Sequence, residues 1–176
     1  MKIHATLLAA GAVVACNCAL AGPDNYIHLP GVEYGEREID FRLGTAKSKD
    51  EPRESAATIG FGWGATPWWF TEIYAKYKRE AGENGQATRF DAIEWENKFQ
   101  LTETGKYPLD VGLLIEIERP REHAEGWELK YGPLLQTDFG KVQLNGNVLF
   151  ERAYRAAERT TTEIGPSSSC AYRARR

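Results

Sequence analysis

Acidic and basic residues recur at every second position in several segments of the chain, and their spacing could support chemistry. In residues 109–118, the odd positions are large and apolar, and the even positions are mostly acidic or small. Successive side chains of a β-strand point to opposite faces, so such a segment has one apolar face and one charged face. Carboxylates gathered on one face repel each other unless a cation, a proton or a lysine lies between them. Cation binding or proton uptake is therefore the chemistry open to them.

Charged positions of neighbouring strands are expected to meet on one face. Aligning the strands by their turns places Glu94 near Glu116, Glu116 near Lys130, and Glu72 at a similar height. We expect these side chains to line the lumen of a barrel, either as a cation-binding or proton-responsive site or pore lining, or as mixed ion pairs filling a narrow interior. Ion pairs are the favoured interpretation. The predicted lumen charges are Glu72, Lys76, Glu94, Glu96, Lys98, Asp110, Glu116, Glu118, Glu128, Lys130 and Glu151.

Residues for catalysis are scarce. The three histidines are His4, His28 and His123, and only His123 has acidic neighbours, Glu122 and Glu125, with no convincing nucleophile. We expect His123 to be a solvated loop residue. The sequence has no Cys/His metal-ligand spacing, no phosphate-binding glycine loop and no G-x-S-x-G motif. It therefore predicts no enzymatic activity, no metal and no cofactor.

Seven segments carry the strand alternation that would position these charges. They are residues 32–43, 55–65, 69–78, 89–101, 109–118, 127–136 and 142–151. The first changes phase near Gly35, where we expect a β-bulge. The connections alternate between long, charged segments and short turns, as in barrels whose outer loops are long and periplasmic turns short. The length of 176 residues fits one domain, with the barrel at residues 32–152.

The N-terminal residues predict export. Residues 1–21 resemble a signal peptide, with Lys2, a short apolar core and an Ala19-Leu20-Ala21 cleavage site, followed by a polar lead at residues 22–31. An alternative is lipidation of Cys16 in a lipobox-like sequence, although cleavage after Ala21 is favoured. Cleavage would leave Cys170 as the only cysteine of the mature chain, which could then form no internal disulfide.

The formal net charge of −3 gives no basic footprint, which excludes nucleic acid as an expected partner. No apolar run approaches the roughly 20 residues of a transmembrane helix. We therefore predict an all-β fold, an antiparallel up-and-down transmembrane β-barrel of about eight strands in the bacterial outer membrane. Aromatic residues near the expected strand ends would form interfacial girdles, with ordinary core or turn aromatics as the alternative. They are Trp68, Trp69, Tyr77, Tyr107 and Trp127.

The C-terminal segment departs from the pattern. Pro166 and the serines at 167–169 disfavour a central strand where an eighth should run. Outer-membrane barrels usually end in an aromatic residue that the assembly machinery reads, whereas this sequence ends in Arg176. We therefore expect residues 153–176 to be an irregular tail, truncated or frame-shifted, that leaves the barrel incomplete.

Residues 32–41, 68–72 and 89–112 carry a family resemblance that extends from Val32 to about Arg152. The chain resembles small outer-membrane β-barrel proteins of Gram-negative bacteria, specifically an uncharacterised exported proteobacterial family. The resemblance implies the lipid bilayer and the outer-membrane assembly machinery as partners, and no catalytic residues.

Three functions are open. The first is an integral outer-membrane protein with a structural or small-solute passage role. The second is a soluble periplasmic barrel that binds a hydrophobic ligand, because such a barrel would turn its apolar face inward with the same period. The third is an outer-membrane hydrolase, which only His123 supports.

Overall fold

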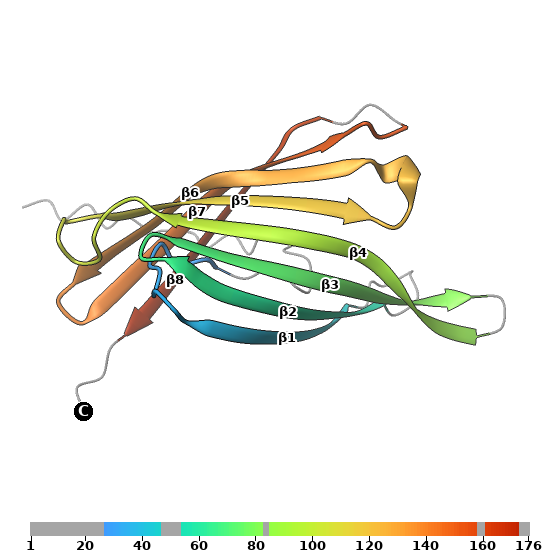
Figure 1. Ribbon diagram of the computed structural model, residues 1–176, viewed down its shortest axis with the longest axis horizontal. Coiled ribbons are helices and arrows are strands. Elements are labelled where there is room, and N and C mark those ends of the chain that lie inside the picture. The colour runs from blue at the N-terminus through green and yellow to red at the C-terminus, as the bar shows by residue number, and fades with distance from the viewer. Residues whose placement is uncertain (1–26, 47–53, 83–84, 158–160, 173–176) are drawn as a thin grey trace, which may run out of the picture.

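The computed structural model describes residues 27–46, 54–82, 85–157 and 161–172. The predicted signal peptide and Cys16 lie outside these residues. The described chain forms one antiparallel sheet in which eight strands follow each other in sequence order, and the sheet is strongly curled (Figure 1). The strands are β1 Arg37–Ala46, β2 Glu54–Thr66, β3 Trp69–Gly82, β4 Gly85–Gln100, β5 Asp110–Pro120, β6 Trp127–Phe139, β7 Val142–Tyr154 and β8 Glu163–Tyr172.

The one described helix is the 3-10 turn η1 (His123–Glu125). No helix among the described residues is long and apolar enough to cross a membrane. The all-β, up-and-down architecture predicted from the alternation is confirmed, and each of the seven predicted segments overlaps one of the strands β1 to β7.

The start of β1 differs from the prediction. The phase change near Gly35 comes from a turn before the strand, not from a bulge within it. Gly35 adopts a φ of 79°, a left-handed conformation that glycine reaches without steric cost. Its N–H donates to the carbonyl oxygen of Gly64 (2.9 Å), and Gly64 N–H donates to that of Glu36 (3.0 Å). The turn therefore delivers the chain from the lead into β1 alongside β2.

The expectation of an irregular tail is wrong for residues 163–172, which form β8 and pair with β7. Pro166 lies opposite Val148. A proline is tolerated at the edge of a sheet, where its missing N–H need not join a ladder on both sides. β8 is the last strand in the order, and no pairing joins it to β1 in the described part of the chain, so that the sheet is not closed.

The two faces of the sheet differ in burial. The inner face, which carries Tyr74, Leu114 and Leu134, is buried, and its side chains are at most 1% exposed at these three positions. The outer face carries large apolar side chains that are exposed, among them Ile39 and Phe41. Alternation along each strand produces this separation, because neighbouring side chains point to opposite faces.

The predicted polar lead at residues 22–31 is described from residue 27, and the name lead is used from here on for residues 27–36, which precede β1 and lie on the inner face near the short turns. Val32 N–H donates to Oε1 of Gln100 on β4 (2.7 Å). A Cβ atom on Gly112 of β5 would lie 2.9 Å from the Cα atom of Pro30, so that the lead packs directly on the β5 backbone. Asn147 of β7, with its amide turned to satisfy both groups, donates to the carbonyl oxygen of His28 (3.0 Å) and accepts from its N–H (2.9 Å). The lead thus bridges strands from both halves of the sheet.

Candidate functional site

The structure places all eleven predicted lumen charges on the inner face, and none of them is exposed. They are Glu72 and Lys76 on β3, Glu94, Glu96 and Lys98 on β4, Asp110, Glu116 and Glu118 on β5, Glu128 and Lys130 on β6, and Glu151 on β7.

Cross-strand pairing arranges most of these charges in two adjacent rows. One row runs from Glu72 through Glu96, Glu116 and Lys130 to Glu151. The next row runs through Glu94, Glu118 and Glu128. Residues directly opposite each other have Cβ atoms about 5 Å apart, so that charges within a row interact.

Lys76 neutralises two carboxylates. Its Nζ atom forms an ion pair with Glu94 on the adjacent strand and donates to Oε2 of Glu118, one strand further, at 2.6 Å. The side chains of Glu94 and Glu118 are only 4% and 15% exposed. A charge-assisted bond of this kind is strong because little water competes for either partner.

Lys130 forms a second bridge. Its Nζ donates to Oε1 of Glu116 at 2.8 Å and lies 3.5 Å from Oε2 of Glu151. The predicted proximity of Glu116 and Lys130 is confirmed. The predicted neighbour Glu94 is not directly opposite Glu116, because that position belongs to Glu96. The carboxylates of Glu94 and Glu116 nevertheless lie within 4.8 Å of each other, together with that of Glu118.

Two of the predicted charges have other surroundings. Asp110 accepts the N–H of Gly105 at both carboxylate oxygens (2.9 and 3.0 Å), which ties together the turn between β4 and β5. Lys98 places its Nζ 5.0 Å from the ring centre of Phe70, a cation–π contact on the inner face. Asp110 lies near the short turns, away from the two rows, whereas Lys98 lies two residues from Glu96 on β4 and interacts with its charge.

Sequence reasoning missed a charge pair on β1. The Nε atom of Arg42 donates to Oδ2 of Asp40 and its Nη2 atom donates to the hydroxyl of Tyr74, each at 2.5 Å. The same alternation that located the other charges would have found this pair, since Asp40 and Arg42 are two residues apart within a predicted strand.

His28 is the other residue that sequence reasoning missed. It is 7% exposed, and its Nδ1 atom lies 3.5 Å from Oε1 of Glu96. One ligand atom from each of His28, Glu96 and Glu116 lies within 4.8 Å of the other two. No local signal could have found this arrangement, because the lead has no alternation and its docking depends on contacts with distant strands.

Carboxylates outnumber lysines in the two rows of the described inner face. The only lysine within the described rows is Lys130, and Lys76 reaches Glu94 and Glu118 from outside them. The carboxylates of the rows are Glu72, Glu94, Glu96, Glu116, Glu118, Glu128 and Glu151. Glu72 is 2% exposed, and its Oε1 atom has no hydrogen-bond partner in the described part of the protein. Buried negative charge of this kind is costly unless it is paired or neutralised.

The predicted girdle residues lie on the outer face or in the turns. Trp68, Tyr77, Tyr107 and Trp127 are between 38% and 54% exposed, and Trp69 is half-buried. Trp69 donates its indole N–H to Oδ1 of Asn97 at 3.0 Å.

Tryptophan side chains cover two polar residues of the outer face. Trp95 donates its indole N–H to Oγ1 of Thr71 (2.9 Å), and Thr71 donates in turn to Oδ1 of Asn97 (3.1 Å). Thr71 and Asn97 are only 2% and 5% exposed. The outer face therefore presents aromatic rings rather than unsatisfied polar groups at this point.

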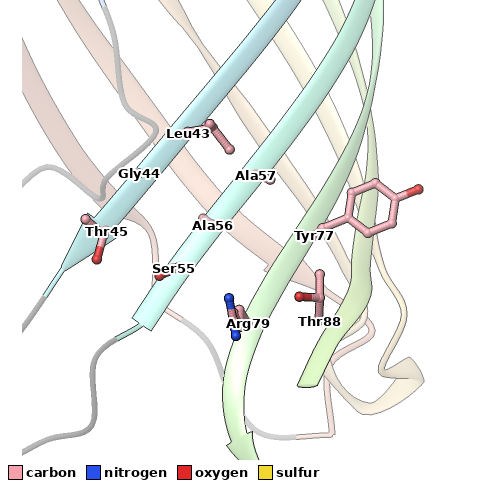
Figure 2. Close-up of a pocket in the computed structure, with 9 residues that line it drawn as sticks. All are labelled: Leu43, Gly44, Thr45, Ser55, Ala56, Ala57, Tyr77, Arg79 and Thr88. Carbon is pink, nitrogen blue, oxygen red and sulfur yellow. The ribbon is translucent and has the colours of Figure 1, made fainter. Parts of the chain in front are cut away.

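A hollow lies at the loop end of β1, β2 and β3 (Figure 2). Small residues of β2, including Ser55 and Ala57, line it between Leu43 and Tyr77. None of its lining residues is acidic, a histidine or a cysteine, so that Ser55 has no base there to activate it. The hollow offers no catalytic set.

Fold and site together define an all-β protein whose single antiparallel sheet buries ionisable side chains on one face and exposes large apolar side chains on the other. The chain matches no known protein family, no curated protein and no solved structure.

Proposed function

We propose that this protein is an integral β-barrel protein of the bacterial outer membrane with a structural role. The observation that carries the proposal is the reversal of burial between the two faces. Glu72, Glu94 and Glu96 are 2–3% exposed, whereas Ile39 and Phe41 are 77% and 64% exposed. A protein that folds in water normally has the opposite arrangement.

The free energy gained by removing the apolar side chains of the outer face from water supports this proposal. Burying a large apolar side chain contributes about 1.5–3 kcal/mol relative to leaving it in water. Ile39, Phe41, Phe61, Ile73 and Trp95 are all more than two-fifths exposed. A hydrocarbon environment would supply this stabilisation without any other part of the chain covering the sheet.

Strand length and polar satisfaction also fit a bilayer. A transmembrane strand needs about 9–11 residues, and the shortest strands, β1 and β8, have 10 residues each. Hydrocarbon supplies no hydrogen bonds, so that polar groups on a lipid-facing surface need protein partners. The indole N–H groups of Trp69 and Trp95 provide such partners for Asn97 and Thr71.

Occupation of the inner face favours a structural role over passage of solutes. On this face, Lys76 of β3 forms ion pairs with β4 and β5, and Lys130 of β6 forms ion pairs with β5 and β7. The lead lies against β4, β5 and β7. A small barrel has an interior that its own side chains fill. An open strand edge is not tolerated in lipid, so the proposal requires β1 and β8 to become paired or covered in the membrane.

The other two functions have less support. A soluble barrel that binds a hydrophobic ligand would need an apolar inner face, whereas many residues of the inner face here are ionisable. A hydrolase would need His123 close to a nucleophile, and His123 is an exposed residue of η1 between exposed neighbours.

Tryptophan fluorescence provides the test, because all five tryptophans lie on the outer face or in a turn: Trp63, Trp68, Trp69, Trp95 and Trp127. Two variants would keep one tryptophan each, Trp95 near the middle of the sheet and Trp68 in the β2–β3 turn, with phenylalanine at the other positions. Both are refolded into vesicles whose lipids carry bromine near the middle of the acyl chain. We expect bromine to quench Trp95 more strongly than Trp68.

Equal, weak quenching of Trp95 and Trp68 would contradict the proposal. Carbonate extraction of membranes from expressing cells gives a second result, for which we expect the protein to stay in the pellet. Release into the soluble fraction would support the soluble barrel instead.

A further inference from the structure

We infer that His28, Glu96 and Glu116 form a binding site for a divalent transition-metal ion, with Zn²⁺ as the probe that fits it. The three residues come from separate parts of the chain, the lead, β4 and β5. They are 7%, 3% and 5% exposed, so that the ion would be held away from bulk water. This inference does not depend on the membrane proposal, because the site consists only of contacts within the protein.

The distances suit a metal after a small adjustment. Zinc binds imidazole nitrogen and carboxylate oxygen at about 2.0–2.2 Å, so that two ligands of a tetrahedral ion lie about 3.4 Å apart. His28 Nδ1 and Glu96 Oε1 are already 3.5 Å apart. One ligand atom from each of the three residues lies within 4.8 Å of the others. Closing the remaining gap takes at most about 1.4 Å, which rotation of a glutamate side chain can supply.

The donor types select the class of ion. One imidazole and two carboxylates form a mixed nitrogen and oxygen set that suits Zn²⁺ and related divalent ions, whereas Ca²⁺ and Mg²⁺ prefer oxygen ligands alone. Three protein ligands would leave a fourth position for water.

The surrounding carboxylates would favour a cation, although Lys98 and Arg42 also act on Glu96. Carboxylates outnumber lysines in the two rows. Glu72 is buried, and its carboxylate lies over Gly60 and Gly62 of β2, on the side of β3 away from Glu116. Glu72 lies directly opposite Glu96 on the neighbouring strand. A divalent ion between Glu96 and Glu116 would offset the repulsion within this row. Glu116 can keep Lys130 as a partner, because its carboxylate has two oxygens.

The lead presents His28 in a fixed place. Asn147 bonds to both backbone groups of His28, and Gln100 accepts the N–H of Val32 four residues later. Ligands held in this way lose little conformational freedom when the ion binds, which favours affinity. Bound metal would fasten the lead to β4 and β5.

The test is calorimetric titration of Zn²⁺ into purified, metal-free protein in detergent. We expect one saturable site per chain. His28→Ala and Glu96→Gln should each weaken binding at least tenfold, because each removes a ligand. His123→Ala and Glu128→Gln are matched controls, since they remove an exposed histidine and an inner-face carboxylate outside the site. Both should bind as the wild type does.

Histidine ring resonances of the wild type give a readout that needs no variant. Zn²⁺ should shift the resonances of His28 and leave those of His123 in place. The inference is overturned if the wild type shows no saturable binding, or if His28→Ala binds with unchanged affinity. Binding that survives His28→Ala and is lost in Glu118→Gln would place the ion among Glu94, Glu116 and Glu118, and would overturn it as well.

Discussion

Removing the positive charge of Lys76 should destabilise the protein strongly. In Lys76→Met, two carboxylates lose the ammonium group that lies between them. At the 2.6 Å between Lys76 Nζ and Glu118 Oε2, and an effective dielectric constant near 20, the Coulomb attraction is about 6 kcal/mol. Desolvation of the lysine offsets part of this term. Breaking a buried ion pair by removing one partner costs about 3–5 kcal/mol, which we expect as the loss in free energy of unfolding.

Repulsion between the two carboxylates contributes to this loss. Glu94 and Glu118 have carboxylate oxygens within 4.8 Å of each other, and Lys76 separates their charges. Adding Glu94→Gln and Glu118→Gln to the lysine variant removes all three charges. This triple variant should regain most of the lost stability, since replacing a whole buried ionic group is often close to neutral.

Urea unfolding of the reconstituted protein, followed by tryptophan fluorescence, measures both effects. Lys141→Met is the control, because Lys141 is exposed in the short turn between β6 and β7. A surface substitution of this kind should change stability by less than about 0.5 kcal/mol. If Lys76→Met costs no more stability than Lys141→Met, or if the triple variant is less stable than the single one, the ion pairs of Lys76 do not stabilise the inner face.

Three further changes test the two faces and the lead. If the outer face contacts lipid, Ile73→Arg should lower the free energy of unfolding in vesicles by about 2–4 kcal/mol, as measured by urea titration. A loss below about 1 kcal/mol would indicate that this face contacts water. Gly60→Ala should lower the free energy of unfolding by about 1–3 kcal/mol, because the added Cβ would lie 2.3 Å from Cε1 of Tyr74. Gly165→Ala is the control and should leave stability nearly unchanged, because no atom lies within 4 Å of the added Cβ. Asn147→Leu should speed hydrogen exchange of the lead amides at least tenfold while the strands stay protected, and unchanged exchange would show that Asn147 does not hold the lead.

Alternation predicted which face each charged residue occupies, but it could not settle the register between strands. A period of two residues permits shifts by two without moving any side chain to the other face. Glu94 lies near Glu116 as predicted, with carboxylate oxygens within 4.8 Å, but the residue directly opposite Glu116 is Glu96. The geometry of the turn between β4 and β5 determines which residues of the two strands pair. Gly105 adopts a φ of 72°, and its N–H donates to Asp110, a turn geometry that segment length alone does not reveal.

β8 and the docking of His28 were beyond sequence reasoning for different reasons. Residues 165–169 have weak strand propensity, and β8 owes its position to pairing with β7. His28 is brought to Glu96 by contacts between segments far apart in the chain. Patterns in a sequence depend on residues that are close together in the chain, so that they predict neither the pairing of β8 nor the position of His28.

Docking of the lead has a consequence for the order of folding. The lead is the first described segment of the chain, yet its backbone bonds with Asn147 require β7, the seventh of eight strands. Closing so long a loop early carries a large entropic cost, and contacts of wide sequence separation generally form late. The lead, which is translated before all eight strands, should therefore be among the last of the described segments to become fixed. Until then, the carboxylates of the inner face would remain open to solvent and to any ion that reaches them.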